Sequence, residues 1–162
     1  MEGFNELELL KMAKGVEEEG YRFYMEAAER FQDEDIKQMF HYLALEEAEH
    51  VKVFEQLYDR VAARLGVSEE YLMEEEVVQY LKAISDTAIF NTNGLTYYRV
   101  QQVNTVRDAL LIGMQAEKDA ILFYETFLKN TKTDMTQKVL ERLIKEEVKH
   151  LYQFKVLIQE LK

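Results

Sequence analysis

The sequence repeats itself with a period of 100 residues. Residues 10–61 align with residues 110–161 without a gap, and ten aligned positions are identical. The identical pairs are Leu10 and Leu110, Glu17 and Glu117, Phe23 and Phe123, Tyr24 and Tyr124, Leu43 and Leu143, Glu46 and Glu146, Glu47 and Glu147, His50 and His150, Phe54 and Phe154, and Leu57 and Leu157. An internal repeat is normally one structural unit used twice, so we expect two copies of whatever residues 10–61 form.

Each copy of the repeat has the pattern of two helices. Apolar residues recur at intervals of three and four from Leu10 to Ala28, and again from Phe40 to Val61, which is typical of one helix face. The chain has no proline and only six glycines, so it lacks the commonest helix breakers. We therefore predict an all-α protein with long helices.

The predicted helices form two hairpins in one domain that spans residues 1–162. The first hairpin covers about 5–65, with a helix over 5–31 and a second that starts at Asp33 as its N-cap. The second hairpin covers about 105–161, and Thr105 with Asp108 has the spacing of a capping box. Between them, a crossover over about 66–104 should contain a short helix after Ser68 and an irregular stretch over 85–98.

Composition excludes several classes of function. The chain has no cysteine, so it cannot form disulfides, iron–sulfur clusters or thiolate zinc sites. Its net charge of -11 opposes binding to nucleic acid or to anionic membranes. The N-terminal region has no basic start with a long apolar run, and no stretch approaches the roughly 18 apolar residues of a spanning helix. We expect a cytoplasmic protein.

Ionisable residues interrupt the apolar face of every predicted long helix. Glu17 is seven residues before Tyr24, so both lie on the same inward stripe. Glu47 and His50 are three residues apart and interrupt the apolar stripe of the next helix. The second copy repeats these residues as Glu117, Tyr124, Glu147 and His150.

Four carboxylates and two imidazoles aimed into an apolar core require a compensating cation, because uncompensated burial costs several kcal/mol or more each. Glutamate fills 24 of 162 positions, so one E-x-x-H motif means little. Two of the three histidines, however, show it at equivalent positions, each with a Glu 30 residues upstream of its paired Glu. Oxygen ligands with one histidine per ion suit iron or manganese. The predicted metal ligands are Glu17, Glu47, His50, Glu117, Glu147 and His150.

The E-x6-Y motifs at Glu17 and Glu117 and the E-x-x-H motifs at Glu47 and Glu147 resemble those of the ferritin-like di-iron carboxylate superfamily, and within it the rubrerythrin-like proteins. The resemblance covers nearly the whole chain. It implies a ferritin-like four-helix bundle of two helical hairpins, with a long crossover that contains a short helix. It also implies two iron ions per chain, with manganese possible.

The resemblance further implies individual ligand roles. Glu17 and Glu117 would be terminal carboxylates, one per metal, while Glu47 and Glu147 would bridge the two ions. The ions would be capped by His50 and His150. From spacing alone, Tyr24 and Tyr124 each lie two turns from a ligand on the same face, so we expect them to hydrogen-bond the ligand carboxylates; the alternative is a pair of core tyrosines with satisfied hydroxyls. His41 lies about 120° off the metal stripe and is predicted to lie outside the site, and most carboxylates of the acidic runs 17–19 and 74–76 should face solvent.

The chain departs from rubrerythrins in two ways. Rubrerythrins carry a rubredoxin domain, which this cysteine-free chain cannot build. They also have an additional Glu one turn after the ligand of the third helix, where this chain has Ala120. Electrons should therefore come from an external donor, a separate rubredoxin or a flavoprotein reductase, and the irons should keep the same ligands in both redox states.

The leading hypothesis for function is a di-iron oxidoreductase that reduces hydrogen peroxide or dioxygen, most simply as a homodimer. The principal alternative is a ferroxidase that stores iron. Hydroxylation of an organic or macromolecular substrate is a third hypothesis, and it requires a substrate channel. A non-catalytic bundle with solvated carboxylates is the fourth.

Overall fold

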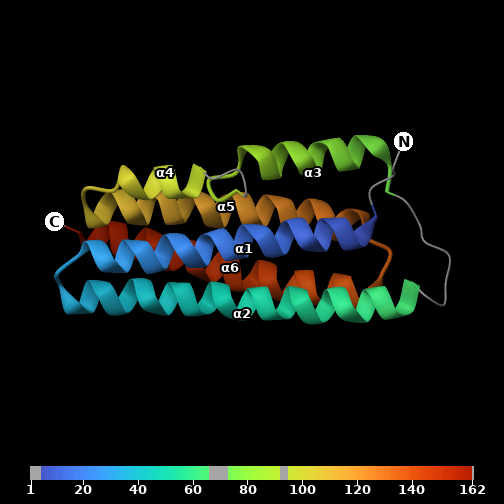
Figure 1. Cartoon of the computed structure of the whole chain (residues 1–162), viewed down its shortest axis with the longest axis horizontal. Coiled ribbons are helices and arrows are strands. Elements are labelled where there is room, and N and C mark those ends of the chain that lie inside the picture. Colours follow the sequence, from blue (N-terminus) through green and yellow to red (C-terminus); the bar gives the residue numbers. More distant parts are fainter. Residues whose placement is uncertain (1–4, 66–72, 92–94, 162) are drawn as a thin grey trace.

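The computed structural model describes residues 5–65, 73–91 and 95–161. In chain order, its helices are α1 (Glu6–Arg30), α2 (Glu34–Leu65), α3 (Glu75–Thr87), α4 (Leu95–Gln101), α5 (Val106–Asn130) and α6 (Asp134–Glu160) (Figure 1). All regular secondary structure in these residues is helical. The all-α prediction is confirmed.

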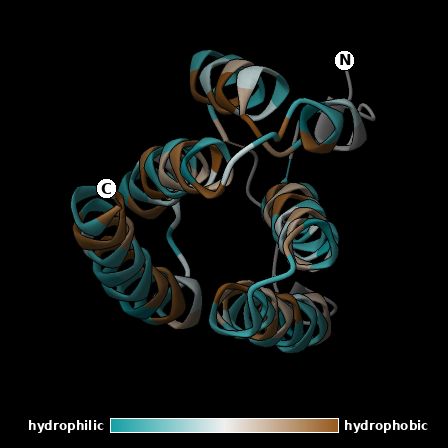
Figure 2. Cartoon of the chain, turned by 90° about the vertical axis from the view of Figure 1, so that its left-hand side faces the viewer, coloured by the Kyte–Doolittle hydropathy of each residue, from teal (hydrophilic) through white to brown (hydrophobic). Residues whose placement is uncertain are grey.

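Four long helices form the bundle. α1 packs against α2 and α5 packs against α6, which gives the two predicted hairpins. The crossover helices lie outside the bundle, with α3 against α5 and α4 against α1. Seen along the bundle, the long helices surround a common axis (Figure 2). The predicted ferritin-like arrangement of two hairpins joined by a crossover is confirmed.

Side chains that follow the predicted capping patterns define the helix starts. Thr105 and Asp108 form a reciprocal capping box at α5, as predicted. At the start of α2, the Asp33 carboxylate accepts the backbone N–H groups of Asp35 and Ile36 at 3.0 and 3.1 Å. These contacts satisfy amide groups that have no partner within the helix.

The crossover contains helical segments, as predicted, but their bounds differ from those expected. Ser68, after which a short helix was expected, lies outside the described residues, and α3 begins at Glu75. The stretch over 85–98, predicted to be irregular, contains the end of α3 and the start of α4. A seven-residue helix is marginal by itself. α4 is stabilised by docking, because Val100 is 2% exposed within the core.

The core has two apolar halves along the bundle. One half gathers residues such as Leu10, Phe54 and Phe127. The other contains Phe23 and Phe154, among others. On all four long helices the residues predicted to bind metal fall between these halves in sequence.

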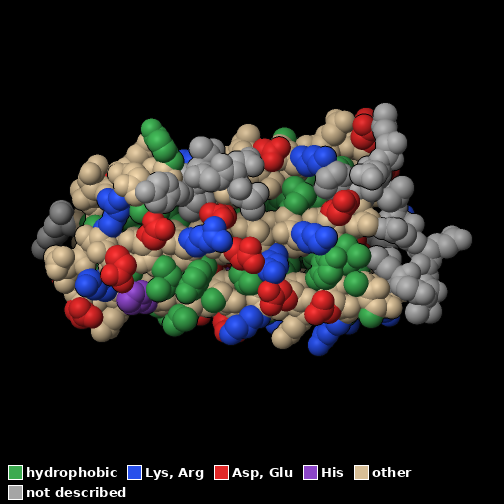
Figure 3. Space-filling view, in the orientation of Figure 1, with side chains coloured by type: hydrophobic (Ala, Val, Ile, Leu, Met, Phe, Trp, Pro, Cys, Tyr) green, Lys and Arg blue, Asp and Glu red, His purple; other side chains and the backbone are tan. Residues whose placement is uncertain are grey.

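The surface is charged and mixed. On the face shown in Figure 3, acidic and basic side chains are interspersed over the helices. No helix in the described part of the chain is both long and apolar enough to cross a membrane.

Candidate metal centre

The structure brings the six predicted ligand residues into the middle of the bundle. α1 supplies Glu17 and α5 supplies Glu117. α2 supplies Glu47 with His50, and α6 supplies the equivalent pair Glu147 and His150. Each of the six is at most 6% exposed. The helical spacing seen in the sequence therefore places all of them in the protein interior.

A first cluster contains residues from three helices. One ligand atom from each of Glu17, Glu47, His50 and Glu147 lies within 4.8 Å of the others. His50 Nδ1 is 3.4 Å from Glu17 Oε2 and 2.9 Å from Glu147 Oε1. Gly20 lets the Glu47 carboxyl group lie close to α1, because a Cβ at residue 20 would be 3.3 Å from the Glu47 carboxyl carbon.

A second cluster adjoins the first and contains Glu117, Glu147 and His150. His150 Nδ1 is 3.1 Å from Glu147 Oε2 and 3.8 Å from Glu117 Oε1. Glu147 thus belongs to both clusters, whereas Glu47 belongs to the first alone. This geometry suits Glu147 for the predicted bridging role and gives Glu47 a less symmetric place than the sequence repeat suggests.

Two glutamates that sequence reasoning missed contact the outer nitrogens of the histidines. His50 Nε2 lies 2.9 Å from Glu146 Oε2, and His150 Nε2 lies 3.4 Å from Glu46 Oε2. Each glutamate comes from the opposite hairpin, and about a third of its side chain is exposed. Glu46 and Glu146 are an identical pair in the repeat, which was the available signal. Each directly precedes the glutamate of an E-x-x-H motif, and that motif drew the prediction instead.

The two tyrosines also contact the opposite hairpin. The Tyr124 hydroxyl donates a hydrogen bond to Glu17, and the Tyr24 hydroxyl donates one to Glu117 at 3.5 Å. Seven residues of helix span about 10 Å, so neither tyrosine is placed to reach the glutamate on its own helix. The sequence predicted tyrosine–carboxylate bonds but not this crossing.

Residues excluded on sequence grounds lie elsewhere. His41 Nε2 is 3.9 Å from Glu29 on the neighbouring helix, and its side chain is 44% exposed. All three glutamates of 74–76 are exposed. Glu18 and Glu19 form ion pairs with Lys14 and Arg22 at 3.4 and 3.0 Å.

Crowding of carboxylates perturbs their protonation. Burial raises the pKa of Glu47 well above its usual range, and the Glu17 carboxylate raises it further. Burial and the Glu147 carboxylate do the same to the pKa of Glu117. Burial and neighbouring carboxylates thus favour the neutral form of both Glu47 and Glu117.

Glu147 and the two histidines instead favour their charged forms. Burial alone would raise the pKa of Glu147, but the neighbouring side chains of Glu117, His150 and His50 outweigh it and lower the pKa, with His150 Nδ1 lying 3.1 Å from Glu147 Oε2. Burial alone would lower the pKa of His50, but the carboxylates of Glu17 and Glu147 raise it far above its usual value. The pKa of His150 is also raised, chiefly by its hydrogen bond to Glu147 against the effect of burial. The centre therefore attracts positive charge.

The donor atoms fit a divalent metal site. His50 Nδ1 and Glu147 Oε1 are buried without a hydrogen bond, although they lie 2.9 Å apart, because they are not aligned for one. If a bound metal displaced the Nδ1 proton, an N–H kept at Nε2 and directed at Glu146 would leave the Nδ1 lone pair facing the cluster. Oxygen and imidazole ligands in this combination suit iron or manganese.

Comparisons with known proteins agree with this fold. The family model described as Rubrerythrin matches residues 8–158. The fold is similar to a crystal structure, at 2.30 Å resolution, of a protein from Thermotoga maritima described as a ferritin-like diiron-carboxylate protein. The TM-score is 0.74 at 24% sequence identity, covering 100% of this chain and 99% of the other. No curated protein matches the sequence.

Proposed function

The chain belongs to the rubrerythrin family, and on that premise we propose that its buried centre holds two iron ions and reduces hydrogen peroxide or dioxygen with electrons from an external donor. The observation that carries the proposal is a pair of adjoining buried clusters that share Glu147. One ion would be held by Glu17, Glu47, His50 and Glu147. The other would be held by Glu117, Glu147 and His150, and manganese could replace iron.

The chemistry supplied by two bound ferrous ions is the delivery of two electrons to a small oxidant. The protein's part is to position ligands and to exclude water. Glu146 holds the imidazole of His50 at 2.9 Å. The apolar halves of the core, with Phe54 on one side and Phe154 on the other, enclose the centre.

The tyrosines hold the terminal carboxylates. Burial raises the pKa of Tyr24, and the negative charge of Glu117 adds to the effect. The pKa of Tyr124 is raised by burial and by Glu17. Both hydroxyls therefore stay protonated and continue to donate hydrogen bonds to the carboxylates at neutral pH.

The external donor and the fixed ligand set follow from what the sequence lacks. The chain has no cysteine with which to build a rubredoxin domain, so a separate rubredoxin or a flavoprotein reductase would supply the electrons. Neither Ala120 nor its repeat partner Gly20 offers a further carboxylate. The metals would accordingly keep the same ligands in both redox states.

Rapid mixing of the anaerobically reduced protein with peroxide, and separately with dioxygen, tests this function. We expect about one peroxide consumed per centre in a fast single turnover, and sustained turnover only when a donor is added. His50→Ala should abolish the fast phase, while His41→Ala should preserve it because His41 lies outside the cluster. Slow reaction with peroxide, together with fast oxidation by dioxygen and formation of an iron mineral, would instead identify an iron-storing ferroxidase.

A further inference from the structure

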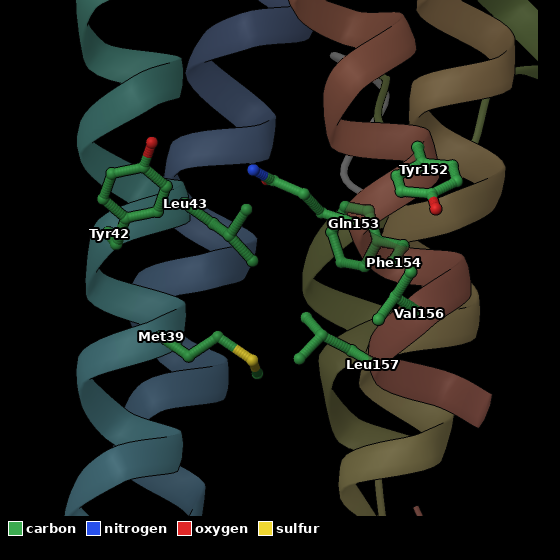
Figure 4. A pocket seen from close by; sticks show the side chains of 8 residues that line it. All are labelled: Met39, Tyr42, Leu43, Tyr152, Gln153, Phe154, Val156 and Leu157. Carbon is green, nitrogen blue, oxygen red and sulfur yellow. The ribbon is translucent and has the colours of Figure 1, made fainter. Parts of the chain in front are cut away.

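A groove lies between α2 and α6 (Figure 4). Its volume is about 390 Å³, within the range of small-molecule sites. Two of its lining residues, Leu43 and Phe154, are almost completely buried. Leu43 is one helical turn before Glu47, and Phe154 is one turn after His150. The groove therefore ends within a turn of the metal-ligand residues.

The groove is lined almost entirely by apolar surface. Met39 and Leu43 on α2 point across it toward Val156 and Leu157 on α6 (Figure 4). None of the described residues that line it is charged. A charged ligand would lose hydration there without gaining a countercharge. The lining thus favours an uncharged ligand.

The opposite flank of the centre is covered by the crossover. The Asp119 carboxylate accepts the backbone N–H of Ile89 at 2.8 Å. The Phe90 ring, 4% exposed, packs 4.9 Å from the Phe23 ring. On the α2–α6 flank, by contrast, a third of each of the Glu46 and Glu146 side chains reaches solvent. On this flank, solvent therefore reaches two side chains that contact the metal-ligand histidines.

From these observations we infer that the groove binds an uncharged, largely hydrocarbon small molecule next to the metal-ligand residues. A second copy of the chain fits this place less well. It would bring another net charge of -11 toward the flank on which Glu46 and Glu146 are each about a third exposed, and like charges repel. This binding goes beyond the proposed redox function and does not require a loaded metal.

Fluorescence titration of the full-length protein with 6-propionyl-2-(dimethylamino)naphthalene, a neutral apolar dye, tests the inference. The chain has no tryptophan, so its own emission does not overlap. We expect saturable binding of one dye per chain, displaced by decanol and at least about tenfold less effectively by the decanoate anion. Val156→Phe fills the groove and should weaken dye binding by about tenfold or more.

The matched control is Val148→Phe, the same substitution on the same helix at a position that is 49% exposed and not part of the groove lining. It should leave dye affinity unchanged. Met39→Phe fills the groove from α2 and should repeat the loss, which guards against misfolding of a single variant. Equal dye affinity in all variants, or no saturable binding, overturns the inference. A dimer by size-exclusion chromatography that excludes the dye and dissociates on Val156→Phe also overturns it, and assigns the groove to a second copy.

Discussion

At the scale of single residues, the centre depends on side chains that have very little room. Gly113 on α5 lies beneath Phe154 and Tyr24, and a Cβ there would come within 2.6 Å of the Phe154 ring and 2.9 Å of the Tyr24 hydroxyl. At Gly20 the nearest atoms would lie 3.3 Å away. Alanine favours a helix over glycine by about 1 kcal/mol, so the outcome of a substitution depends on whether the neighbours can move.

We predict that Gly113→Ala lowers the free energy of unfolding by about 1–3 kcal/mol, because overpacking at two buried rings exceeds the helix-propensity gain. Gly20→Ala should cost less, since its neighbours need to shift by only a few tenths of an ångström. Urea denaturation followed by circular dichroism measures both. Equal stability of the two variants would contradict the packing described for Gly113.

A second residue-scale prediction concerns the tyrosines. Tyr124→Phe removes the hydroxyl that donates to Glu17 and should lower Fe(II) or Co(II) affinity about 10- to 100-fold. Tyr24→Phe should have a smaller effect, because its bond to Glu117 is long at 3.5 Å. Anaerobic metal titration measures the change, with the half-exposed Tyr21→Phe as the control. Unchanged metal affinity in Tyr124→Phe would show that the Tyr124 hydroxyl does not support metal binding by Glu17.

The sequence predicted residues on a helix face better than it predicted their partners across the bundle. A seven-residue spacing places Glu17 and Tyr24 on one stripe, but it does not show which residues of another helix lie opposite. Glu46 and Glu146 were missed for the same reason, because their contacts run between hairpins. Packing of the two hairpins determines these pairs, and periodicity within one helix carries no information about it.

At the scale of secondary-structure elements, local capping signals were the most predictable features and the crossover was the least. The capping box of Thr105 and Asp108 is encoded within four residues. The stability of α4 comes instead from docking of residues such as Val100 onto the bundle. Its helical state is therefore a property of the folded protein.

The capping box predicts a pH-dependent contribution to stability. Hydrogen bonds from the backbone of Asn104 and from the backbone and side chain of Thr105 lower the pKa of Asp108. A depressed pKa in the folded state stabilises the protein above the unfolded pKa of about 3.9, and this contribution is lost as pH falls through the folded pKa. Asp108→Ala should therefore lower Tm at pH 7 more than at pH 3, as measured by circular dichroism. An equal loss at both values would contradict the ionised cap.

The hydrogen bond between Ile89, just after α3, and Asp119 on α5 gives a further prediction. Asp119→Ala removes the acceptor for the Ile89 N–H and should speed amide hydrogen exchange at Ile89. Asp119→Asn retains an acceptor oxygen and should preserve much of the protection. Hydrogen exchange followed by mass spectrometry distinguishes them. Equal protection in both variants would show that this contact does not hold the crossover.

At the scale of the whole molecule, the bundle is nearly symmetric but its centre is not. The two hairpins supply matching residues, yet only Glu147 belongs to both clusters. The family resemblance implied equal bridging roles for Glu47 and Glu147, and the sequence repeat could not reveal this difference because the aligned residues are identical.

This asymmetry predicts unequal effects of equivalent substitutions. The wild-type protein should bind close to two Fe(II) per chain. Glu147→Ala should abolish the coupled pair and weaken both ions, because it removes a ligand from each cluster. Glu47→Ala should leave one ion near Glu117, Glu147 and His150. Iron analysis with Mössbauer spectroscopy measures occupancy and coupling, and equal loss in the two variants would contradict the assigned asymmetry.

The crossed tyrosines also bear on how such a chain arose. Tyr124 completes the surroundings of Glu17, and Tyr24 those of Glu117, so neither half of the chain contains a whole site. A chain of one such hairpin would make the same contacts by pairing with an identical copy. The period of 100 residues fits duplication of a hairpin with the crossover between the two copies. Joined in one chain, the copies can differ at equivalent positions, as Gly20 and Ala120 do.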